Sequence, residues 1–388
     1  MNAPKLRFKE FNDEWKFDKI SNLTTYVDYR GKTPTKTETG IFLVTAKNVK
    51  KGYIDYNCSK EYVETSQYND VMHRGLPQIG DVLITTEAPC GNVAQINNIN
   101  VALAQRIIKY RGKELINNTF LKYELLSDYF QKELRKVTSG GTVSGVKGSV
   151  LHQMNINYCS KDEQIKISNF LSLLDKKIEL QTKKIEVLKL FKKGLIKTFF
   201  SDRNLKQIKI NEVGRIITGT TPSKSINSYW DNGDITWVTP TDINENRDID
   251  NSIFKITDDG LKNGRFIPKN SILVTCIASI GKNAILKVDG SCNQQINAII
   301  PNKNFNYNYI YYLVESISNY MKSIAGTSAT SIINKDEFSK ITVRIHPKEK
   351  QDYIASMLSQ FESKILLENS KLNQLNQLKK GLMQNMFV

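Results

Sequence analysis

The sequence predicts an α+β fold that is built twice: two similar globular domains, with mixed or antiparallel sheets and helices, separated by two long helices that pack as an antiparallel coiled coil with pseudo-two-fold symmetry. Three observations support this prediction. A chain of 388 residues is too long for one comfortable core. The stretch FKKGLIKTFF at residue 191 returns as LKKGLMQNMF at residue 378. The segments that precede the two stretches also share short motifs in the same order.

The repeated stretch is the end of a longer repeat with helical character. Residues 161–200 align without a gap on residues 348–387, and neither segment contains proline. Each would form a continuous helix of about 60 Å at 1.5 Å per residue. Read in heptads, eight of the ten a and d positions in each copy are apolar, and the two polar breaks fall at equivalent places. That pattern is typical of a coiled coil.

An apolar stripe of this length must be buried, and the other copy in the same chain is its simplest partner. Antiparallel packing would bring Gln181 and Glu368 together at the helix midpoints as a polar register mark. Alternatively both point to water, or the stripe binds a helix of another protein. Gly194 and Gly381 either allow close helix approach or mark frayed final turns. The predicted seam residues are Ile167, Leu171, Leu174, Ile178, Gln181, Ile185, Leu188, Phe199, Ile354, Leu358, Phe361, Ile365, Glu368, Leu372, Leu375 and Met386.

The two globular segments echo each other. Their apolar stretches are short, rich in Val, Ile and Thr, and separated by Gly, Asn and Asp, which is typical of strands joined by turns. The predicted division is a domain at 1–160, a helix at 161–203, a domain at 204–347 and a helix at 348–388. The matching motifs are RGKTPTK (30–36) with TGTTPSK (218–224), VTAKNV (44–49) with VTPTDI (238–243), DVLITTEAPCGNVA (81–94) with SILVTCIASIGKNA (271–284), AQRI (104–107) with NQQI (293–296), and SGGTVSGV (139–146) with AGTSATSI (325–332).

The charge balance indicates a polyanionic partner. Fifty-five Lys and Arg against 39 Asp and Glu leave a net charge of +16, which favours nucleic acid, although a surplus for solubility is the alternative. The five cysteines form no C-x-x-C pair and the three histidines lie far apart, so neither a disulfide framework nor a metal site is predicted. No apolar run is long enough to cross a membrane, and the start lacks the apolar core of a signal peptide. We expect a cytoplasmic protein without membrane contact.

The ordered motifs resemble a known family. The double G-x-T-P-[ST]-K, the G-T-[VS] stretch late in each half and the duplicated helix ending in KKGL are similar to the DNA specificity subunits of type I restriction-modification systems. The resemblance covers the whole chain, from LRFKEF at residue 6 to LKKGLMQNMF at residue 378. No single motif is specific to that family, but the ordered set, present twice, is.

The resemblance implies a function and a set of partners. Each globular half would be a target-recognition domain that reads one part of a split duplex DNA site. The two helices would set the spacing and dock methyltransferase subunits, two of them by the internal symmetry, and restriction subunits would join to make the nuclease. S-adenosylmethionine, ATP and Mg²⁺ are expected on those partner subunits only. Because the two halves differ in their loops, an asymmetric site is expected, with its parts about one helical turn, roughly 34 Å, apart.

Candidate DNA-binding residues lie in the shared motifs. Phosphate contacts are predicted for Arg30, Lys32, Lys36 and Lys224. Base contacts are predicted for Lys47, Asn48, Gln105, Arg106, Asp242, Asn283, Gln294 and Gln295, since Arg suits guanine and Asn or Gln suits adenine. Thr33, Lys147, Thr220, Thr221, Ser223 and Lys282 complete the predicted surface. For each residue the alternative is a solvated loop side chain, and for both Thr-Pro pairs it is a helix N-terminus.

No catalytic motif is evident. A DNA methyltransferase would need a Pro-Pro tetrapeptide and a nucleotide-binding glycine motif, and neither occurs. The stretch GGTVSGVKGS at 140–149 lacks the lysine spacing of a phosphate loop, and the histidines have no recognisable Cys or Ser partner. The prediction is therefore a non-catalytic subunit. A basic coiled-coil protein that binds nucleic acid without reading its sequence, and an unfamiliar catalyst, remain as alternatives. For Trp230 and Trp237, core packing is favoured over base stacking.

Overall fold

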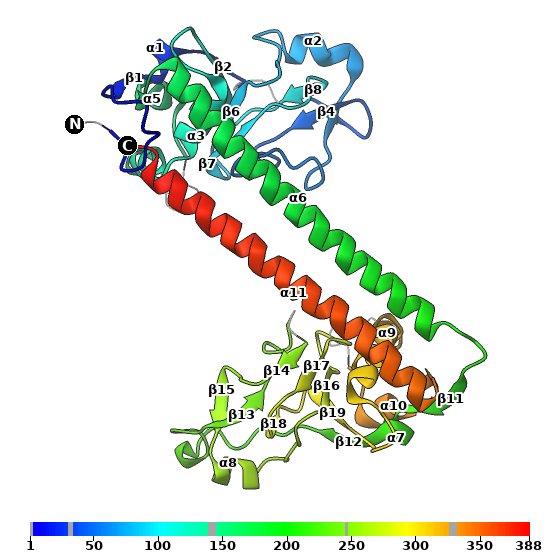
Figure 1. The fold of residues 1–388 in the computed structure, drawn as a ribbon. Helices are drawn as coiled ribbons and strands as arrows, with labels where there is room; N and C mark the ends of the chain where they lie inside the picture. Colours follow the sequence, from blue (N-terminus) through cyan, green and yellow to red (C-terminus); the bar gives the residue numbers. More distant parts are fainter. Residues whose placement is uncertain (1–2, 30–33, 139–144, 245–246, 326–331) are drawn as a thin grey trace. The chain divides into compact units, whose positions relative to one another are not determined.

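A computed structural model describes residues 3–29, 34–138, 145–244, 247–325 and 332–388. The chain forms two compact units (Figure 1): unit 1 comprises Met1–Gln181 and Lys371–Val388, and unit 2 comprises Thr182–Ser370. Both divisions fall inside the long helices α6 (Lys161–Phe200) and α11 (Lys348–Asn385). Each unit therefore consists of one globular domain together with one part of each long helix.

Unit 1 contains two small sheets and a terminal strand pair. The first sheet is antiparallel, in the order β2-β9-β6-β7, and the second has the order β3-β5-β4-β8 with a parallel β4–β8 pair. Strands β1 and β10 pair antiparallel. The elements are β1 (Lys16–Lys19), α1 (Ile20–Leu23), β2 (Thr24–Asp28), β3 (Lys36–Thr37), β4 (Ile41–Val44), β5 (Tyr62–Val63), a 3-10 turn (Thr65–Gln67), α2 (Tyr68–Val71), β6 (Val82–Thr86), β7 (Cys90–Gln95), β8 (Val101–Leu103), β9 (Ile107–Gly112), α3 (Asn118–Leu126), α4 (Asp128–Val137), α5 (Gly148–Gln153) and β10 (Asn155–Tyr158).

Unit 2 repeats this topology. Its sheet order β12-β19-β16-β17 matches β2-β9-β6-β7 and adds β14 at the edge, and the parallel β13–β18 pair matches β4–β8. Strands β11 and β20 pair antiparallel, like β1 and β10. The elements are β11 (Lys206–Lys209), α7 (Ile210–Val213), β12 (Gly214–Thr218), a 3-10 turn (Asn227–Tyr229), β13 (Ile235–Val238), β14 (Asp248–Ile249), β15 (Phe254–Ile256), α8 (Asp258–Lys262), β16 (Ile272–Thr275), β17 (Asn283–Leu286), β18 (Gly290–Cys292), β19 (Ile296–Pro301), α9 (Tyr307–Ile324), α10 (Lys335–Lys340) and β20 (Thr342–Ile345). The predicted duplicated α+β fold is confirmed.

The repeat extends to individual backbone conformations. After β6 and after β16 the chain turns through a left-handed alanine, Ala88 with φ 47° and Ala278 with φ 61°, and then through Gly91 and Gly281 with φ 82° and 80°. A Cβ on Gly281 would lie 2.5 Å from Ser318 Oγ, so glycine is required there by space as well as by backbone conformation. The matching segments 81–94 and 271–284 therefore contain the same turn.

Each long helix is tied to its domain by a buried glutamine. In unit 1, Gln164 of α6 accepts a hydrogen bond from the backbone N–H of Asn117 at 2.8 Å, and in unit 2 Gln351 of α11 accepts one from Asn306 at 3.2 Å. Asn117 and Asn306 are the N-caps of α3 and α9. Both glutamines are almost fully buried, so leaving either amide unpaired would carry a desolvation penalty. This joint fixes a cap residue of the domain against the start of the helix.

One polar break of the heptad pattern in each long helix is a lysine with acidic partners, buried at Lys192 and half-buried at Lys379. In unit 1, Lys379 of α11 lies 2.5 Å from Asp175 of α6, which is also 3.7 Å from Lys122 of α3. In unit 2, Lys192 of α6 lies 2.5 Å from Glu362 of α11 and 3.2 Å from Glu315 of α9. Lys192 and Lys379 are equivalent in the repeat, as are Asp175 and Glu362. Each helix therefore supplies the lysine of one pair and the acid of the other.

The environments of the two lysine clusters differ. Burial lowers the pKa of Lys122 to about 8, although Asp175 acts against the shift. Burial would also lower the pKa of Lys192, but Glu315 and Glu362 outweigh it and raise that pKa. In unit 2, Lys184 pairs with Glu368 at 2.9 Å and Lys192 with Glu362, so the helix segments run antiparallel there.

The predicted seam residues are all buried or half-buried. Toward the ends of the seam they also enter the domain cores: Ile167 and Leu171 share a core with Met386, and Ile354 and Leu358 belong to the main core of unit 2. A Cβ on Gly194 or Gly381 would meet nothing within 4 Å among the described residues, and both lie inside their helices, so neither marks a close approach there. The pairing of Gln181 with Glu368 stays a prediction, because these residues belong to different units.

Glu124 of α3 is a fully buried carboxyl group in unit 1. Its Oε1 accepts a hydrogen bond from the backbone N–H of Asn157 at 2.9 Å. Burial nevertheless raises the pKa of Glu124 from 4.5 to about 8, and the Asn157 hydrogen bond only partly offsets that shift. The side chain is therefore protonated at neutral pH in the folded unit.

Replacing Glu124 with Gln should remove a pH dependence from the stability of unit 1. Between pH 4.5 and about 8 the unfolded carboxyl group releases its proton while the folded one keeps it. Wild-type stability should therefore fall as pH rises, by up to roughly 1.4 kcal/mol per pH unit, and level off above the folded pKa. Urea unfolding at about pH 5 and about pH 8 measures this slope, with the exposed Glu114→Gln as control. Equal slopes in wild type and Glu124→Gln would contradict the assignment.

Candidate nucleic-acid interface

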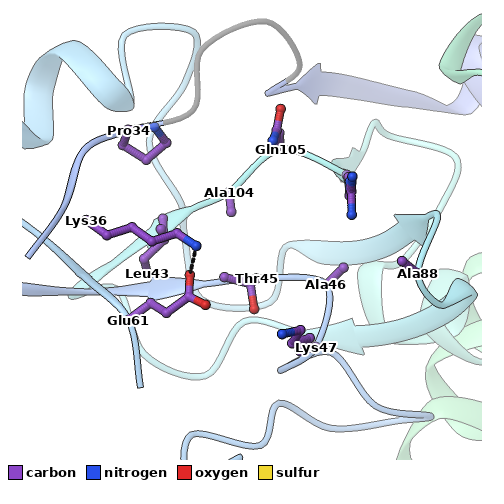
Figure 2. Close-up of a pocket in the computed structure, with 11 residues that line it drawn as sticks. Pro34, Lys36, Leu43, Thr45, Ala46, Lys47, Glu61, Ala88, Ala104 and Gln105 are labelled. Atoms are coloured by element: carbon purple, nitrogen blue, oxygen red, sulfur yellow. Dashed lines mark ion pairs between the residues drawn. The ribbon is translucent and has the colours of Figure 1, made fainter. Parts of the chain in front are cut away.

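In unit 1 the structure gathers four of the predicted DNA-binding residues around one hollow. Lys36 comes from β3, Lys47 from the loop after β4, and Gln105 and Arg106 from the turn between β8 and β9. Figure 2 shows the hollow, whose volume is about 280 Å³. Its other lining residues are Pro34, Leu43, Thr45, Ala46, Glu61, Ala88 and Ala104. Basic and amide side chains therefore surround a floor of small apolar side chains.

Two carboxylates hold the basic groups at this hollow. Lys36 Nζ lies 2.8 Å from Glu61 Oε2, as the dashed line in Figure 2 marks. Arg106 Nε lies 3.4 Å from Glu87 Oε1, and the two side chains are 48% and 38% exposed. Pairs this exposed contribute little to stability, since water screens them. Lys47 is exposed. The site therefore has positive groups that a phosphate or a base edge could engage without disrupting the fold.

Asn48 and Asp242, both predicted to contact bases, hold equivalent turns instead. Asn48 is fully buried, and its Oδ1 accepts hydrogen bonds from the backbone N–H and hydroxyl of Thr45 at 2.9 and 2.7 Å. Asp242 Oδ2 accepts the same two bonds from Thr239, each at 2.7 Å. Asn283 is also buried and donates to the Tyr311 carbonyl oxygen at 2.8 Å. As placed, these three side chains serve the fold, and Asn48 and Asn283 are closed to solvent.

Unit 2 arranges its equivalent residues differently. The Thr221 hydroxyl donates to Gln294 Oε1, and Asn293 Nδ2 donates to Gln295 Oε1 at 3.0 Å. Both predicted glutamine readers therefore have their carbonyl oxygens engaged within the protein. Lys224 and Lys282 are exposed.

The two tryptophans brace the Thr-Pro segment of unit 2. Trp237 is almost fully buried, and its indole N–H donates to the Thr220 carbonyl oxygen at 3.0 Å. Trp230 donates in the same way to the Ser223 carbonyl oxygen at 3.0 Å, and the two rings meet edge to face at 5.0 Å. Packing therefore accounts for both rings. No helix begins at Pro222, so the N-cap interpretation of this Thr-Pro pair is wrong.

Some predicted residues lie elsewhere. Arg30, Lys32 and Thr33, with most of both G-T-[VS] stretches, are outside the described residues. Lys147 is exposed immediately before α5. The sequence analysis missed Glu87, which becomes relevant only because the fold brings it to Arg106. In the repeat alignment Glu87 and Arg106 correspond to Ile277 and Gln295, so the sequence shows that both charged residues are particular to the first half.

Neither a metal centre nor a membrane segment emerges from the part of the chain that the structure describes. Within it, no group of three or more His, Cys, Asp or Glu side chains is arranged to hold a metal ion. Its helices likewise include none with the length and apolar character needed to cross a bilayer.

A duplicated α+β unit built onto two long helices defines an internally repeated two-domain protein. The comparisons with known proteins show its family. The family model described as "Type I restriction modification DNA specificity domain" matches residues 12–190 and again residues 203–377. The chain therefore belongs to the type I restriction-modification DNA specificity family and carries two copies of its domain.

Curated relatives agree with this assignment. Over 169 residues the chain is 36% identical to the type I restriction enzyme MjaIX specificity subunit of Methanocaldococcus jannaschii, covering 42% of this chain and 38% of that protein. It is 30% identical over 173 residues to the EcoR124I/EcoR124II specificity subunit of Escherichia coli, covering 42% of each chain. These matches span about two fifths of each relative. The putative MjaX specificity subunit is 23% identical and covers 98% of this chain and 95% of its own length.

Two solved structures share the whole fold. The S subunit of a type I restriction-modification system from M. genitalium aligns with a TM-score of 0.64 at 16% identity, over 100% of this chain and 99% of that one. A chain from a structure on complex assembly and conformational transition of the type I R-M system aligns with a TM-score of 0.61 at 15% identity, over 95% and 96% of the two chains. At these identities the likeness concerns the fold.

Proposed function

We propose that this chain is the DNA-reading specificity subunit of a type I restriction-modification complex. Each unit reads one part of a bipartite, asymmetric duplex site, and the chain itself is non-catalytic. The long helices set the spacing between the two parts and dock methyltransferase subunits, two per chain, and restriction subunits complete the nuclease in the cytoplasm. S-adenosylmethionine, ATP and Mg²⁺ belong to those partners.

One observation carries the proposal: the units share a topology while equivalent surface positions differ in chemistry. Arg106 in unit 1 corresponds to Gln295 in unit 2, and the neighbouring backbone turns are alike. Base contacts confer sequence preference, whereas phosphate contacts confer affinity. Two domains that read different half-sites therefore need a common scaffold that carries different polar side chains. The net charge of +16 supports a polyanionic partner.

Apolar residues on the outer surface of α6 support docking of a partner helix. In unit 1, Leu173 and Leu180 are 71% and 56% exposed, and in unit 2 Val187 and Leu190 are 65% and 71% exposed. Leu173, Leu180 and Val187 recur every seven residues, which is the spacing of a coiled-coil stripe. Large aliphatic side chains left exposed at regular helical spacing favour contact with another protein. A methyltransferase subunit is the partner that the family assignment suggests.

A domain exchange tests the proposal. The chain is produced with its methyltransferase subunits in a host, and methylated positions are mapped across the host DNA. Replacing residues 1–160 with the matching half of a relative should change one part of the methylated site and leave the other part unchanged. Replacing residues 204–347 is the matched control, and it should change only the other part. A change in both parts after either exchange, or methylation without a defined site, would contradict separate reading by the two units.

A further inference from the structure

Arg106 has an unusual backbone conformation for its residue type. It lies in the turn between β8 and β9 with φ 73°, a left-handed conformation that residues with a Cβ seldom adopt. Its carbonyl oxygen accepts a hydrogen bond from the backbone N–H of Thr86 at 2.9 Å. The turn is thereby held against the end of β6, and the Arg106 side chain stays 48% exposed at the rim of the hollow. Backbone strain kept at an exposed arginine indicates a functional position.

Glu87 orients this arginine. It follows β6 directly, and its Oε1 lies 3.4 Å from Arg106 Nε. The backbone around Glu87 is fixed by the left-handed Ala88 after it and by an antiparallel bridge to Gly145. The contact between Arg106 and Glu87 is an ion pair of 3.4 Å through Nε, and the guanidinium donates no side-chain hydrogen bond within the described residues. Its terminal N–H groups are therefore available to a ligand.

Unit 2 provides an internal comparison at the same positions. The turn after β16 keeps a left-handed alanine, Ala278, and the Glu87–Gly145 bridge has a counterpart in a bridge between Ile277 and Ile332. The ion pair, however, is absent there, because Ile277 and Gln295 replace the acid and the arginine. The left-handed alanine and the bridge after the strand are kept, whereas the left-handed backbone of Arg106 has no counterpart at Gln295. Two facing side chains that both change, together with the backbone that presents one of them, are the pattern expected of a specificity element on a common scaffold.

The surroundings of Arg106 suit a base edge better than a phosphate alone. Ala46, Ala88 and Ala104 line the hollow beside it and leave about 280 Å³ of space. The Glu87 carboxylate repels the full negative charge of a phosphate group placed beside the arginine more strongly than it repels the partial charges of the acceptor atoms of a base. A terminal guanidinium with two free donors matches the O6 and N7 acceptors that guanine presents in the major groove.

We propose that Glu87 and Arg106 form the specificity-determining pair of unit 1: Arg106 donates two hydrogen bonds to one guanine of its half-site, and Glu87 is the positioning residue that aims the guanidinium at that base. This inference rests on the proposed function, because it requires that unit 1 reads duplex DNA. It further implies that the equivalent position of the other half-site, which faces Gln295, does not require guanine.

The test uses the full chain assembled with its methyltransferase subunits and a pool of duplex DNA with randomised positions. Bound duplexes are selected and sequenced for wild type, Arg106→Gln and Glu87→Gln. Arg135→Gln, an exposed arginine on α4, is the matched control. The thermal unfolding of each variant confirms that it is folded. We expect the wild type and the control to select one bipartite site with guanine at a defined position.

Arg106→Gln should lose the preference for that guanine, keep the other half-site, and bind the wild-type site roughly 10- to 100-fold more weakly. Glu87→Gln should keep guanine as the favoured base but discriminate less against the other three. If Arg106→Gln keeps the complete site and weakens binding to all sequences equally, Arg106 is a phosphate contact and the inference fails. If Glu87→Gln selects as sharply as wild type, the positioning role fails. Absence of any selected site with wild type would instead contradict the proposed function.

Discussion

Phe387→Ala should destabilise unit 1 by about 3–5 kcal/mol. The side chain is 6% exposed and lies among aromatic rings of the N-terminal domain, with ring centroids 6.1 Å from Trp15 and 5.7 Å from Phe120. Truncation leaves a cavity between elements that are far apart in sequence, which the surrounding core cannot readily fill. The loss should appear as a lower urea midpoint for probes in unit 1, such as the fluorescence of Trp15.

The control for this prediction lies on α11, which ends two residues before Phe387. Leu378→Ala removes a side chain of α11 in unit 1 that is 53% exposed, and it should change stability by less than about 0.5 kcal/mol. Probes in unit 2, such as the Trp230 and Trp237 pair, should change little in either variant. Equal effects of Phe387→Ala and Leu378→Ala would show that the end of α11 does not complete the core of unit 1.

Lys192→Met should destabilise unit 2 by about 3 kcal/mol at neutral pH. The change preserves most of the side-chain volume. It removes the positive charge that lies 3.2 Å from Glu315 and 2.5 Å from Glu362. Glu362 is largely buried, so its carboxylate would lose its partner without gaining water, while the partly exposed Glu315 should contribute less. Thermal unfolding followed in unit 2 measures the effect.

Two further variants separate charge from packing at this position. The exposed neighbour change Lys193→Met should be nearly neutral. The double change Lys192→Met with Glu362→Gln should recover much of the lost stability, because an amide tolerates burial better than an unpaired carboxylate. If the double variant is as unstable as Lys192→Met alone, the cost arises from packing around residue 192 and not from the stranded acid.

The sequence was sufficient to predict the architecture because the pattern that specifies it is repeated. The sequence alone shows the heptad stripes, the strand-rich halves and the equivalence of Lys192 with Lys379. The acidic partners of those lysines were not predicted, since the pairing of Lys192 with Glu362 depends on the register between two helix segments that are remote in sequence. Periodicity shows which face is buried, but it does not show which residue lies opposite.

The candidate interface could be predicted only in part. Lys36, Lys47, Gln105 and Arg106, which were chosen from three separate motifs, gather at one hollow. The Asn48 side chain bonds to the backbone of its own turn, and the sequence cannot distinguish such a residue from one whose side chain points outward. The repeat alignment shows that Glu87 and Arg106 both differ from unit 2, but their pairing was not predicted, because the two residues are 19 positions apart (87 to 106) and only the sheet brings them together.

The division of the chain makes the folding of the two units depend on different parts of the sequence. Unit 2 is one continuous segment, whereas unit 1 needs residues 371–388 to finish a core that residues 1–181 begin. During synthesis, which proceeds at about 5–20 residues per second, unit 2 depends on one continuous segment, residues 182–370. Unit 1 also needs residues 371–388. Until they are made, the apolar surface around Trp15 and Phe120 is incompletely covered. The core of unit 1 thus closes only when two segments that are remote in the sequence have met.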